Sequence, residues 1–328
     1  MDISSIFSKF ESLRILVIGD VMIDAYIEGK VTRVSPEAPV PIVNLKDRIS
    51  RLGGAANVAL NLAALGATPV LTSVIGEDEG GSDLLQLMQD AGMVTTGIEQ
   101  SADRKTTVKT RVIGNQQQLV RIDDEIIAPL TKEEEDRIIL NVSKHLDEID
   151  AIIFEDYNKG VLTTRVIEQI VAMAREKGVI TTVDPKKDKF FDYKNVTLFK
   201  PNLKELREGL NLHIDLIPKG PAFEEAIAAL EAKLQNEISF VTLSEHGVFI
   251  QKSAQKHYIP AHIRNISDVS GAGDTVISVA TACLAVGLEL RDVAEWANLA
   301  GGLVCECTGV VPIDKELLQA EIAKLEQA

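Results

Sequence analysis

The chain has 328 residues, 45% of them hydrophobic and 25% charged, an ordinary globular composition that provides a sizeable core. Its formal net charge of -15 argues against non-specific binding to nucleic acid or to an anionic membrane. The first residues lack the pattern of a signal peptide, and the longest uncharged stretch is too short and too polar to span a bilayer. We expect a cytoplasmic protein whose three cysteines are buried, reduced thiols: Cys283, Cys305 and Cys307.

Strand-like and helix-like segments alternate along most of the chain. Apolar runs typical of buried parallel strands occupy residues 14–20, 69–76, 151–154, 179–183, 197–200 and 238–243. Helical patterns lie between them and after them, at 53–66, 83–91, 131–146, 163–177, 218–235, 275–284 and 293–307. Because helix follows strand, we expect an α/β fold with a doubly wound, mainly parallel sheet in a single domain covering residues 1–328.

Two β segments depart from this alternation. Residues 25–50 hold two half-exposed strand patterns around a proline-rich break, and residues 105–123 read as a hairpin around a Gly-Asn turn. We expect these segments to pair into a small separate sheet that forms a lid over the site. Lys109, Arg111 and Arg121 alternate along the hairpin. They form either a solvated charged face or, through Arg111, a contact to a substrate phosphate.

A Gly-Ala-Gly-Asp turn at 271–274 opens the helical pattern at 275–284. The amides at a helix N-terminus bind anions, and an aspartate fits there if it accepts a proton from a substrate hydroxyl during phosphoryl transfer. We expect the helix dipole to depress the pKa of Asp274, which leaves a weak base that suffices because the hydroxyl proton leaves late. The alternative is that Asp274 only caps the helix in a tight turn.

Polar residues also follow the predicted strands, where ligands of open α/β sheets bind. Asp20 and Asp24 come directly after the first strand and either accept hydrogen bonds from sugar hydroxyls or cap a loop. A glycine pair opens the next helix and leaves room for a ligand, and Asn57 lies on its first turn.

Two motifs together carry a family resemblance. Residues 53–57 and 268–274 resemble, in the family's order, the two signatures of the ribokinase-like (PfkB) carbohydrate kinases. Residues 19–24, 35–41, 115–121, 155–160 and 184–186 further resemble the D-glycero-β-D-manno-heptose 7-phosphate kinases of ADP-heptose and lipopolysaccharide core precursor synthesis. The resemblance implies a ribokinase-like fold and ATP-dependent phosphorylation of the anomeric hydroxyl, which gives the 1,7-bisphosphate.

The resemblance also assigns roles to individual residues. Asp274 is similar to the catalytic base, and the amides of Gly271, Ala272 and Gly273 to the anion hole. Asn202 and Glu205 resemble the pair that arranges Mg²⁺ and phosphates, with Glu205 acting on the metal through water. The nucleotide side is implied to include Ser244, Glu245, Gly247 and Asn298. The substrate side is implied to include Asp20, Asp24, Gly54, Asn57, Arg111, Asp156 and Lys159.

The implied cofactors are ATP and Mg²⁺, with a monovalent cation left open, and the lid is implied to pair two subunits into a dimer. Two positions depart from the family pattern: Ser270 replaces the usual Thr but keeps a hydroxyl, and Lys200 stands where many members have Asn. Lys200 either adds a cation near the phosphates or points to solvent. No His-x-x-His nucleotidyl-transfer motif follows the kinase, so the resemblance implies that a separate adenylyltransferase acts in the pathway.

Other functions are open at this point. A kinase for another phosphosugar or for a nucleoside uses the same fold, although only 4% aromatic residues argue against a nucleobase pocket. A non-catalytic sugar-phosphate sensor would not need Asp274. A Rossmann dehydrogenase is disfavoured because the first strand is not followed by Gly-x-Gly-x-x-Gly.

Overall fold

The computed structural model describes residues 2–262 and 264–325. Its centre is a nine-stranded main sheet in the order β13-β12-β11-β10-β9-β8-β1-β4-β5. The strands from β5 to β11 in this order are parallel to their neighbours, and β12 and β13 are antiparallel. The strands are β1 (Arg14–Gly19), β4 (Thr68–Gly76), β5 (Ile98–Ser101), β8 (Ala151–Glu155), β9 (Ile180–Asp184), β10 (Leu198–Phe199), β11 (Ile238–Thr242), β12 (Val248–Lys252) and β13 (Gln255–Ile259).

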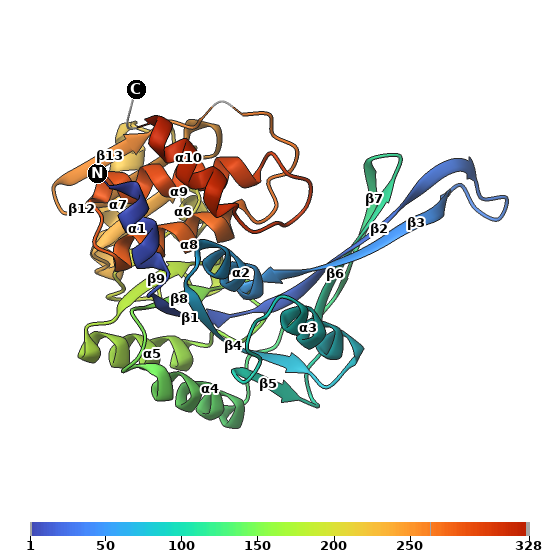
Figure 1. Ribbon diagram of the computed structural model, residues 1–328, viewed down its shortest axis with the longest axis horizontal. Coiled ribbons are helices and arrows are strands. Elements are labelled where there is room, and N and C mark those ends of the chain that lie inside the picture. Colours follow the sequence, from blue (N-terminus) through green and yellow to red (C-terminus); the bar gives the residue numbers. More distant parts are fainter. Residues whose placement is uncertain (1, 263, 326–328) are drawn as a thin grey trace.

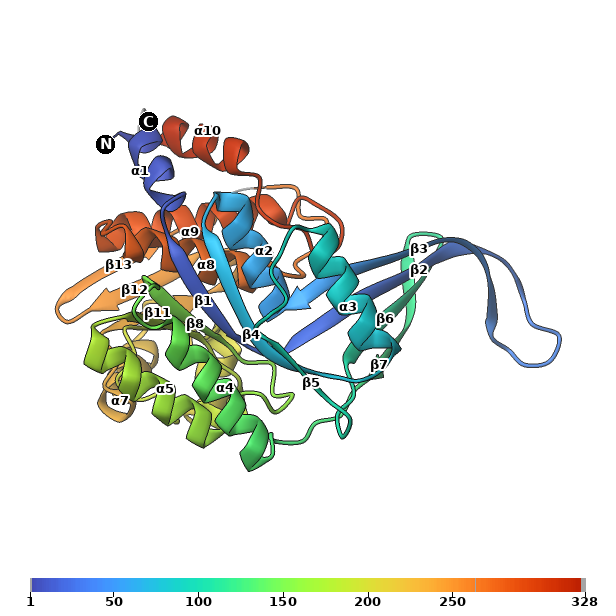
Figure 2. The same ribbon diagram turned by 60° about the horizontal axis from the view of Figure 1, so that its bottom comes forward.

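Helices cover both faces of the main sheet (Figures 1 and 2). The first face carries α1 (Ile3–Phe10), α2 (Ala55–Leu65), α3 (Glu79–Asp90), α8 (Ala272–Ala285), α9 (Leu290–Val304) and α10 (Lys315–Leu325). The second face carries α4 (Lys132–His145), α5 (Thr164–Lys177), α6 (Leu203–Gly209) and α7 (Pro221–Leu234). Two single-turn helices, η1 (Lys187–Lys189) and η2 (Ser244–His246), follow β9 and β11.

Strand β1 shows why its sequence reads as a continuous apolar run. Side chains alternate between the faces of a strand, so Ile15 and Val17 enter the core under the first helical layer. Leu16 and Ile18 enter the core under the second layer, and all four side chains are fully buried. A strand covered on both faces needs apolar residues at every position. The doubly wound, mainly parallel sheet is therefore confirmed.

A second, small sheet in the order β3-β2-β6-β7 extends away from the main sheet (Figure 1). Its strands are β2 (Val21–Val34), β3 (Pro41–Gly54), β6 (Thr107–Gly114) and β7 (Gln117–Asp124). The first hairpin is longer than residues 25–50, because antiparallel pairing continues to Val21 and Gly54. The second hairpin turns at Asn115 and Gln116, with φ of 52° and 66°, one residue later than expected.

Two further details differ from the sequence-based expectations. Helix α3 begins at Glu79 because the Asp78 side chain caps it by accepting a hydrogen bond from the N–H of Gly81. The expectation of three buried thiols is wrong for Cys307, which is exposed beyond the end of α9, while Cys305 is half-buried and Cys283 fully buried. Within the described part of the chain, none of the helices is both long and apolar enough to cross a membrane.

Candidate active site

The Gly-Ala-Gly-Asp turn forms the N-terminus of α8, as the sequence predicted, although the helix already begins at Ala272. Gly271 has a φ of 80°, and a Cβ there would lie 3.0 Å from Nδ2 of Asn57, so both the backbone and the space favour glycine. The N–H of Ala272 donates to the carbonyl of Val269 at 3.3 Å. Those of Gly271 and Gly273 have no acceptor within residues 2–262 and 264–325, which leaves them free for an anion.

Asp274 is the most constrained side chain of the turn, with only 3% of its surface exposed. Its Oδ1 accepts a hydrogen bond from the Tyr157 hydroxyl at 2.8 Å, and its Oδ2 accepts one from Nδ2 of Asn57 at 2.7 Å. Burial raises the pKa of Asp274 to about 6, and the two donated hydrogen bonds only partly oppose that rise. The expected depression of this pKa is therefore wrong, because loss of solvent outweighs the hydrogen bonds from Asn57 and Tyr157 and the charge of Lys200.

Three further charged groups lie beside Asp274. Nζ of Lys200 is 2.8 Å from Oδ2 of Asp184, and both side chains are buried. Lys200 therefore does not point to solvent; a Cβ added at Gly273 would lie 3.7 Å from its Nζ. Carboxylate oxygens of Glu155, Asp184 and Asp274 all lie within 4.8 Å of one another. The sequence showed acidic residues at these strand ends, but it did not show that β8, β9 and α8 bring them to one point.

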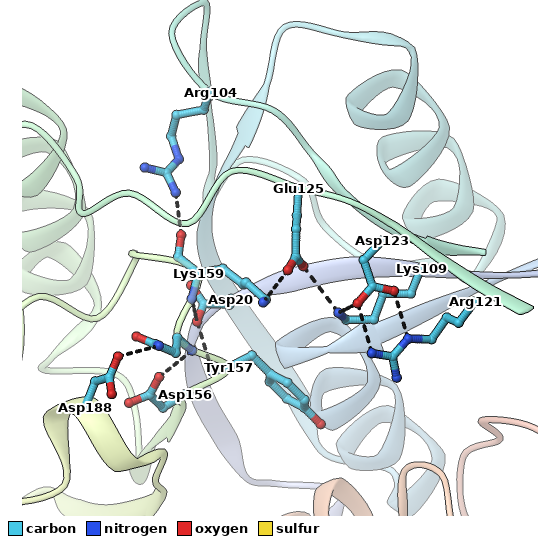
Figure 3. Close-up of polar contacts among 11 residues, drawn as sticks. Asp20, Arg104, Lys109, Arg121, Asp123, Glu125, Asp156, Tyr157, Lys159 and Asp188 are labelled. Atoms are coloured by element: carbon cyan, nitrogen blue, oxygen red, sulfur yellow. Dashed lines mark hydrogen bonds and ion pairs between the residues drawn. The ribbon is translucent and has the colours of Figure 1, made fainter. Parts of the chain in front are cut away.

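The carboxylate of Asp20 is bonded to a loop of the chain, as in the alternative to the expected contact with a sugar. Its Oδ2 accepts hydrogen bonds from the N–H groups of Tyr157 and Lys159, both at 2.9 Å, and its Oδ1 accepts one from Val161 at 3.0 Å. Figure 3 shows the contacts of Asp20 with Tyr157 and Lys159 of this loop. A buried carboxylate with three backbone donors is a structural anchor. Asp20 thus fixes the loop that carries Tyr157 to Asp274.

Asp24 and Arg111 form an ion pair at the base of the small sheet. Asp24 is buried on β2, and Arg111 faces it from the neighbouring strand β6 while its guanidinium lies over the Tyr26 ring, 5.4 Å from the centroid. A Cβ at Gly53 would lie 2.3 Å from Oδ2 of Asp24. Asp24, which was expected to contact the sugar, and Arg111, which was expected to contact the phosphate, are thus bound to each other. The guanidinium of Arg111 nevertheless keeps further N–H donors for a ligand.

Glycine is required at position 54, where β3 meets α2, by both its backbone conformation and the close approach of Asp20. Gly54 has a φ of 60°, and a Cβ there would lie 2.4 Å from the Asp20 carbonyl. It precedes α2, whose buried Asn57 reaches Asp274. The glycine pair therefore brings β3, α2 and the end of β1 close together, which is how Asn57 enters the site.

A chain of charged residues joins the small sheet to the body of the molecule (Figure 3). Glu125 accepts hydrogen bonds from Nζ of Lys159 at 2.8 Å and from Nζ of Lys109 at 3.3 Å. Lys109 also lies 3.3 Å from Asp123, at the end of β7. Lys159 is therefore joined to the small sheet through Glu125 and Lys109.

Asp156 is buried and already paired in the loop after β8. Its Oδ1 accepts a hydrogen bond from the N–H of Asn158 at 2.7 Å, and its Oδ2 accepts one from the Tyr193 hydroxyl at 2.8 Å. Burial, followed by the charge of Asp20, raises its pKa to about 6. These partners support a structural role for Asp156 in shaping the loop.

The residues expected on the nucleotide side form two groups. Asn202 caps α6, and Glu205 completes a capping box by accepting the N–H of Asn202 at 2.9 Å. The other oxygen of Glu205 accepts a hydrogen bond from Nζ of Lys186 at 2.6 Å. Both carboxylate oxygens therefore already have partners, so a metal would be contacted more easily through water than directly.

The second group surrounds Pro260. Ser244, with a φ of 54°, and the exposed Glu245 lie in η2, directly after β11. A Cβ at Gly247 would lie 2.0 Å from the carbonyl of Ile259, and Asn298 donates to the carbonyl of Pro260 at 2.9 Å. The structure thus brings these residues close to one another at the end of β11.

Comparisons with known proteins show the family of the chain. The family model of the pfkB family carbohydrate kinases matches residues 12–316. The Bifunctional protein HldE of Methylobacillus flagellatus is 41% identical over 319 residues, which are 96% of this chain and 64% of the relative. The protein of the same name in Rhodospirillum rubrum is 37% identical over 323 residues, 98% of this chain and 64% of the relative. The chain thus spans 64% of the length of each of these relatives.

Solved structures are similar in fold. Phosphofructokinase-2 from Escherichia coli in complex with potassium has a TM-score of 0.78 at 19% identity, covering 96% of this chain and 99% of that one. Arabidopsis thaliana ribokinase complexed with ribose and ATP has a TM-score of 0.71 at 16% identity, covering 94% and 98%. The fold is therefore ribokinase-like. With its two signatures at the carboxyl edge of a ribokinase-like sheet, the chain belongs to the pfkB family carbohydrate kinases, phosphotransferases with an alcohol group as acceptor.

Proposed function

We propose that this protein transfers a phosphoryl group from ATP to the anomeric hydroxyl of D-glycero-β-D-manno-heptose 7-phosphate and forms the 1,7-bisphosphate for ADP-heptose synthesis. The observation that carries the reaction is the buried Asp274, bonded to Asn57 and Tyr157, beside free amides at the N-terminus of α8. The choice of this sugar as substrate is based on the 37–41% sequence identity to proteins named Bifunctional protein HldE.

In the proposed mechanism, Asp274 accepts the proton of the attacking hydroxyl. A pKa of about 6 leaves it ionised at neutral pH and makes it a better proton acceptor than an ordinary aspartate. The amides of Gly271, Ala272 and Gly273 stabilise the charge of the transferred group, as donors fixed before the reaction. For Ala272 this requires giving up the 3.3 Å hydrogen bond to Val269.

The residues present fit a Mg²⁺–ATP complex. Neither buried carboxylate oxygen of Glu155 has a hydrogen-bond partner among the described residues, which points to a need for positive charge at this edge of the sheet. Glu205 would act on Mg²⁺ through water, since its oxygens already accept hydrogen bonds from Asn202 and Lys186. When bound, Mg²⁺ would neutralise charge on the phosphates. Ser244, Glu245, Gly247 and Asn298 would line the nucleotide side.

On the substrate side, we propose that the small sheet acts as a lid and pairs with its copy in a homodimer. The strands of this sheet expose apolar residues that a solvated sheet would not need: Val34, Leu45, Ile49, Leu119, Val120 and Ile122. Arg111 and Lys159 would contact the 7-phosphate, and Asp24 and Asn57 the sugar hydroxyls. We propose that this acidic protein, with a formal net charge of -15, acts in the cytoplasm.

The test is turnover of ATP with Mg²⁺ against D-glycero-β-D-manno-heptose 7-phosphate, fructose 6-phosphate, ribose and adenosine. We expect selective turnover of the heptose phosphate, with a 1,7-bisphosphate identified by mass spectrometry and ³¹P NMR. Turnover of another sugar would keep the catalytic mechanism and contradict the substrate. Tight binding of a sugar phosphate without turnover of any compound would favour a sensor.

A further inference from the structure

Arg51 on β3 joins the small sheet to a short segment that follows α9, residues 308–310. Its Nη1 donates hydrogen bonds to the carbonyl of Thr308 at 3.0 Å and to that of Val310 at 2.9 Å. Hydrogen bonds from a charged donor are stronger than those between neutral groups. Two of them from one side chain therefore fix the 308–310 segment relative to β3.

The 308–310 segment also contacts the turn at the N-terminus of α8. The N–H of Gly309 donates to Oδ2 of Asp268 at 3.0 Å, and Oδ1 of Asp268 accepts the N–H of Ser270 at 2.9 Å. Val310 lies against the turn itself, because a Cβ added at Gly271 would be 3.3 Å from its Cγ1. The segment thus supports the turn whose amides are proposed to bind the transferred phosphoryl group.

Gly309 brings the segment into direct contact with the small sheet. It has a φ of 74°, and a Cβ there would lie 2.7 Å from Nη1 of Arg51 and 3.3 Å from the Tyr26 hydroxyl oxygen. Both the backbone conformation and the space therefore favour glycine. Because the contact is this close, a shift of Arg51 would be passed on to the segment.

The face of the small sheet that carries Arg51 also carries residues proposed to bind the substrate. Arg51 is paired with Asp24 of β2, and Arg111 is paired with Tyr26 of the same strand. Paired residues, and residues two apart on one strand, lie on the same face. The guanidinium carbons of Arg51 and Arg111 lie 5.6 and 5.4 Å from the centroid of the Tyr26 ring. A phosphate bound by Arg111 would therefore act on the group of side chains to which Arg51 belongs.

We propose that Arg51 is a positioning residue. Through the 308–310 segment it holds the amides of the α8 turn in the geometry needed for phosphoryl transfer, and it links that geometry to the substrate face of the small sheet. This inference rests on the role proposed for those amides. Donors aligned before the reaction supply much of the stabilisation of a transferred phosphoryl group, and a misplacement of about 1 Å costs about 100-fold in rate.

The first measurement is steady-state kinetics of Arg51→Met, with the compound of the panel that the wild type phosphorylates. Methionine fills part of the space of arginine but donates no hydrogen bond, so we expect kcat to fall by at least about tenfold. KM for each substrate should change by less than about threefold, because Arg51 is not placed in contact with either. Arg48→Met provides a matched control on the exposed part of β3 and should leave both constants unchanged.

The conservative variant Arg51→Lys sharpens the comparison. Lysine keeps the charge and N–H donors but lacks the planar guanidinium, so its kcat should lie between those of Arg51→Met and the wild type. An unchanged kcat in Arg51→Met would overturn the proposal. A raised KM for the sugar phosphate with an unchanged kcat would also overturn it, because Arg51 would then bind the substrate rather than position the turn.

Hydrogen–deuterium exchange provides a readout that does not depend on turnover. In Arg51→Met, amides of residues 267–275 and 305–312 should exchange about tenfold faster than in the wild type, because the segment loses its charged donor. Amides of α5, on the other side of the main sheet, should keep the wild-type rate. Unchanged exchange in residues 267–275 would contradict the proposal, and equal acceleration in α5 would show only a general loss of stability.

The two measurements distinguish this inference from the proposed function. If the wild type phosphorylates none of the four compounds, the proposed function is wrong, while local exchange still decides whether Arg51 positions the turn. If the wild type is active and Arg51→Met matches it in kcat and exchange, the function stands and the inference is wrong. If Arg51→Met does not fold, Arg51→Lys carries the same comparison, with a smaller fall in kcat and faster exchange confined to the same residues.

Discussion

The main sheet and the small sheet differ in how their side chains are supported. Strand β1 of the main sheet is covered by helices on both faces, whereas every residue of β7 in the small sheet is exposed. The groups proposed for proton transfer are buried and held by neutral donors, as Asp274 is by Asn57 and Tyr157. The groups proposed for the substrate phosphate are held by opposite charges, Arg111 by Asp24 and Lys159 by Glu125. The difference indicates a rigid catalytic body beside a sheet whose contacts a ligand can exchange.

The largest effect on turnover is expected from a substitution beside the main sheet. Asp274→Asn should lower kcat by about 10²–10⁴-fold, because an amide cannot accept the hydroxyl proton. Binding of the sugar phosphate should be nearly unchanged, since the side chain keeps its shape. Steady-state kinetics with heptose 7-phosphate, together with calorimetric binding, measures the two quantities separately.

A matched control for this change is Asp83→Asn, which alters an exposed aspartate of α3. It should leave both kcat and binding unchanged. If Asp274→Asn weakens binding as much as it slows turnover, Asp274 is a structural cap and the proposed role of the turn is wrong.

The next effect is expected where the small sheet joins the body. Arg111→Ala leaves Asp24 buried without its cation, and breaking a buried pair costs about 3 kcal/mol of unfolding free energy. It should also raise KM for the sugar phosphate more than KM for ATP. Chemical denaturation and kinetics measure these effects, with Arg48→Ala on the exposed part of β3 as the control.

A double variant separates the two roles of Arg111. Asp24→Asn combined with Arg111→Ala removes the unpaired charge of Asp24. The double variant should therefore regain part of the unfolding free energy, while its KM for the sugar phosphate stays raised. An unchanged KM in Arg111→Ala would remove Arg111 from the phosphate site, and its role would be only to neutralise Asp24.

A smaller effect concerns the exposed apolar face of the small sheet. Val120 on β7 is 49% exposed in a single chain, and Val120→Lys would place a charge inside a dimer interface built from this sheet. We expect dimerisation to weaken by at least about tenfold, which corresponds to about 1.4 kcal/mol. Sedimentation equilibrium measures it, with Val94→Lys, another exposed valine, as the control. A wild-type monomer would contradict the dimer.

The sequence predicted the body better than the small sheet, for a physical reason. Strands buried on both faces carry continuous apolar runs, so β1, β4, β8, β9 and β11 were all found. Strand β3 is exposed over most of its length, and exposed strands lack that pattern, so its extent was underestimated. The signature turn was found from local sequence. The convergence of Glu155, Asp184 and Lys200 was not, because it depends on strand order, which local patterns do not contain.

The roles of Asp20 and Tyr157 show the same limit. Asp20 was correctly placed at a strand end, but only the fold shows that it accepts three N–H groups from one loop. That loop carries Tyr157 to Asp274, 117 positions along the chain. No spacing in the sequence links Tyr157 to Asp274.

The smallest effect concerns two aspartates that have similar pKa values and one tyrosine partner each. Burial raises the pKa of both Asp274 and Asp156 to about 6. Tyr157 donates to Asp274, and Tyr193 donates to Asp156. If Asp274 is the base, kcat/KM should fall as the pH drops below about 6, because protonation removes the acceptor.

Tyr157→Phe removes a hydrogen bond that favours the ionised form of Asp274, so the pKa of Asp274 should rise further. The acid limb of the pH profile of kcat/KM should therefore move to higher pH. A hydrogen bond to a charged group contributes about 1.5 kcal/mol, which corresponds to a shift of about one pH unit. At pH 8 the kcat of Tyr157→Phe should stay close to that of the wild type. Tyr193→Phe should leave the acid limb of the pH profile in place. If Tyr193→Phe moves this limb and Tyr157→Phe does not, the titrating group is Asp156. The acid that limits turnover would then lie in the loop after β8 rather than at the N-terminus of α8.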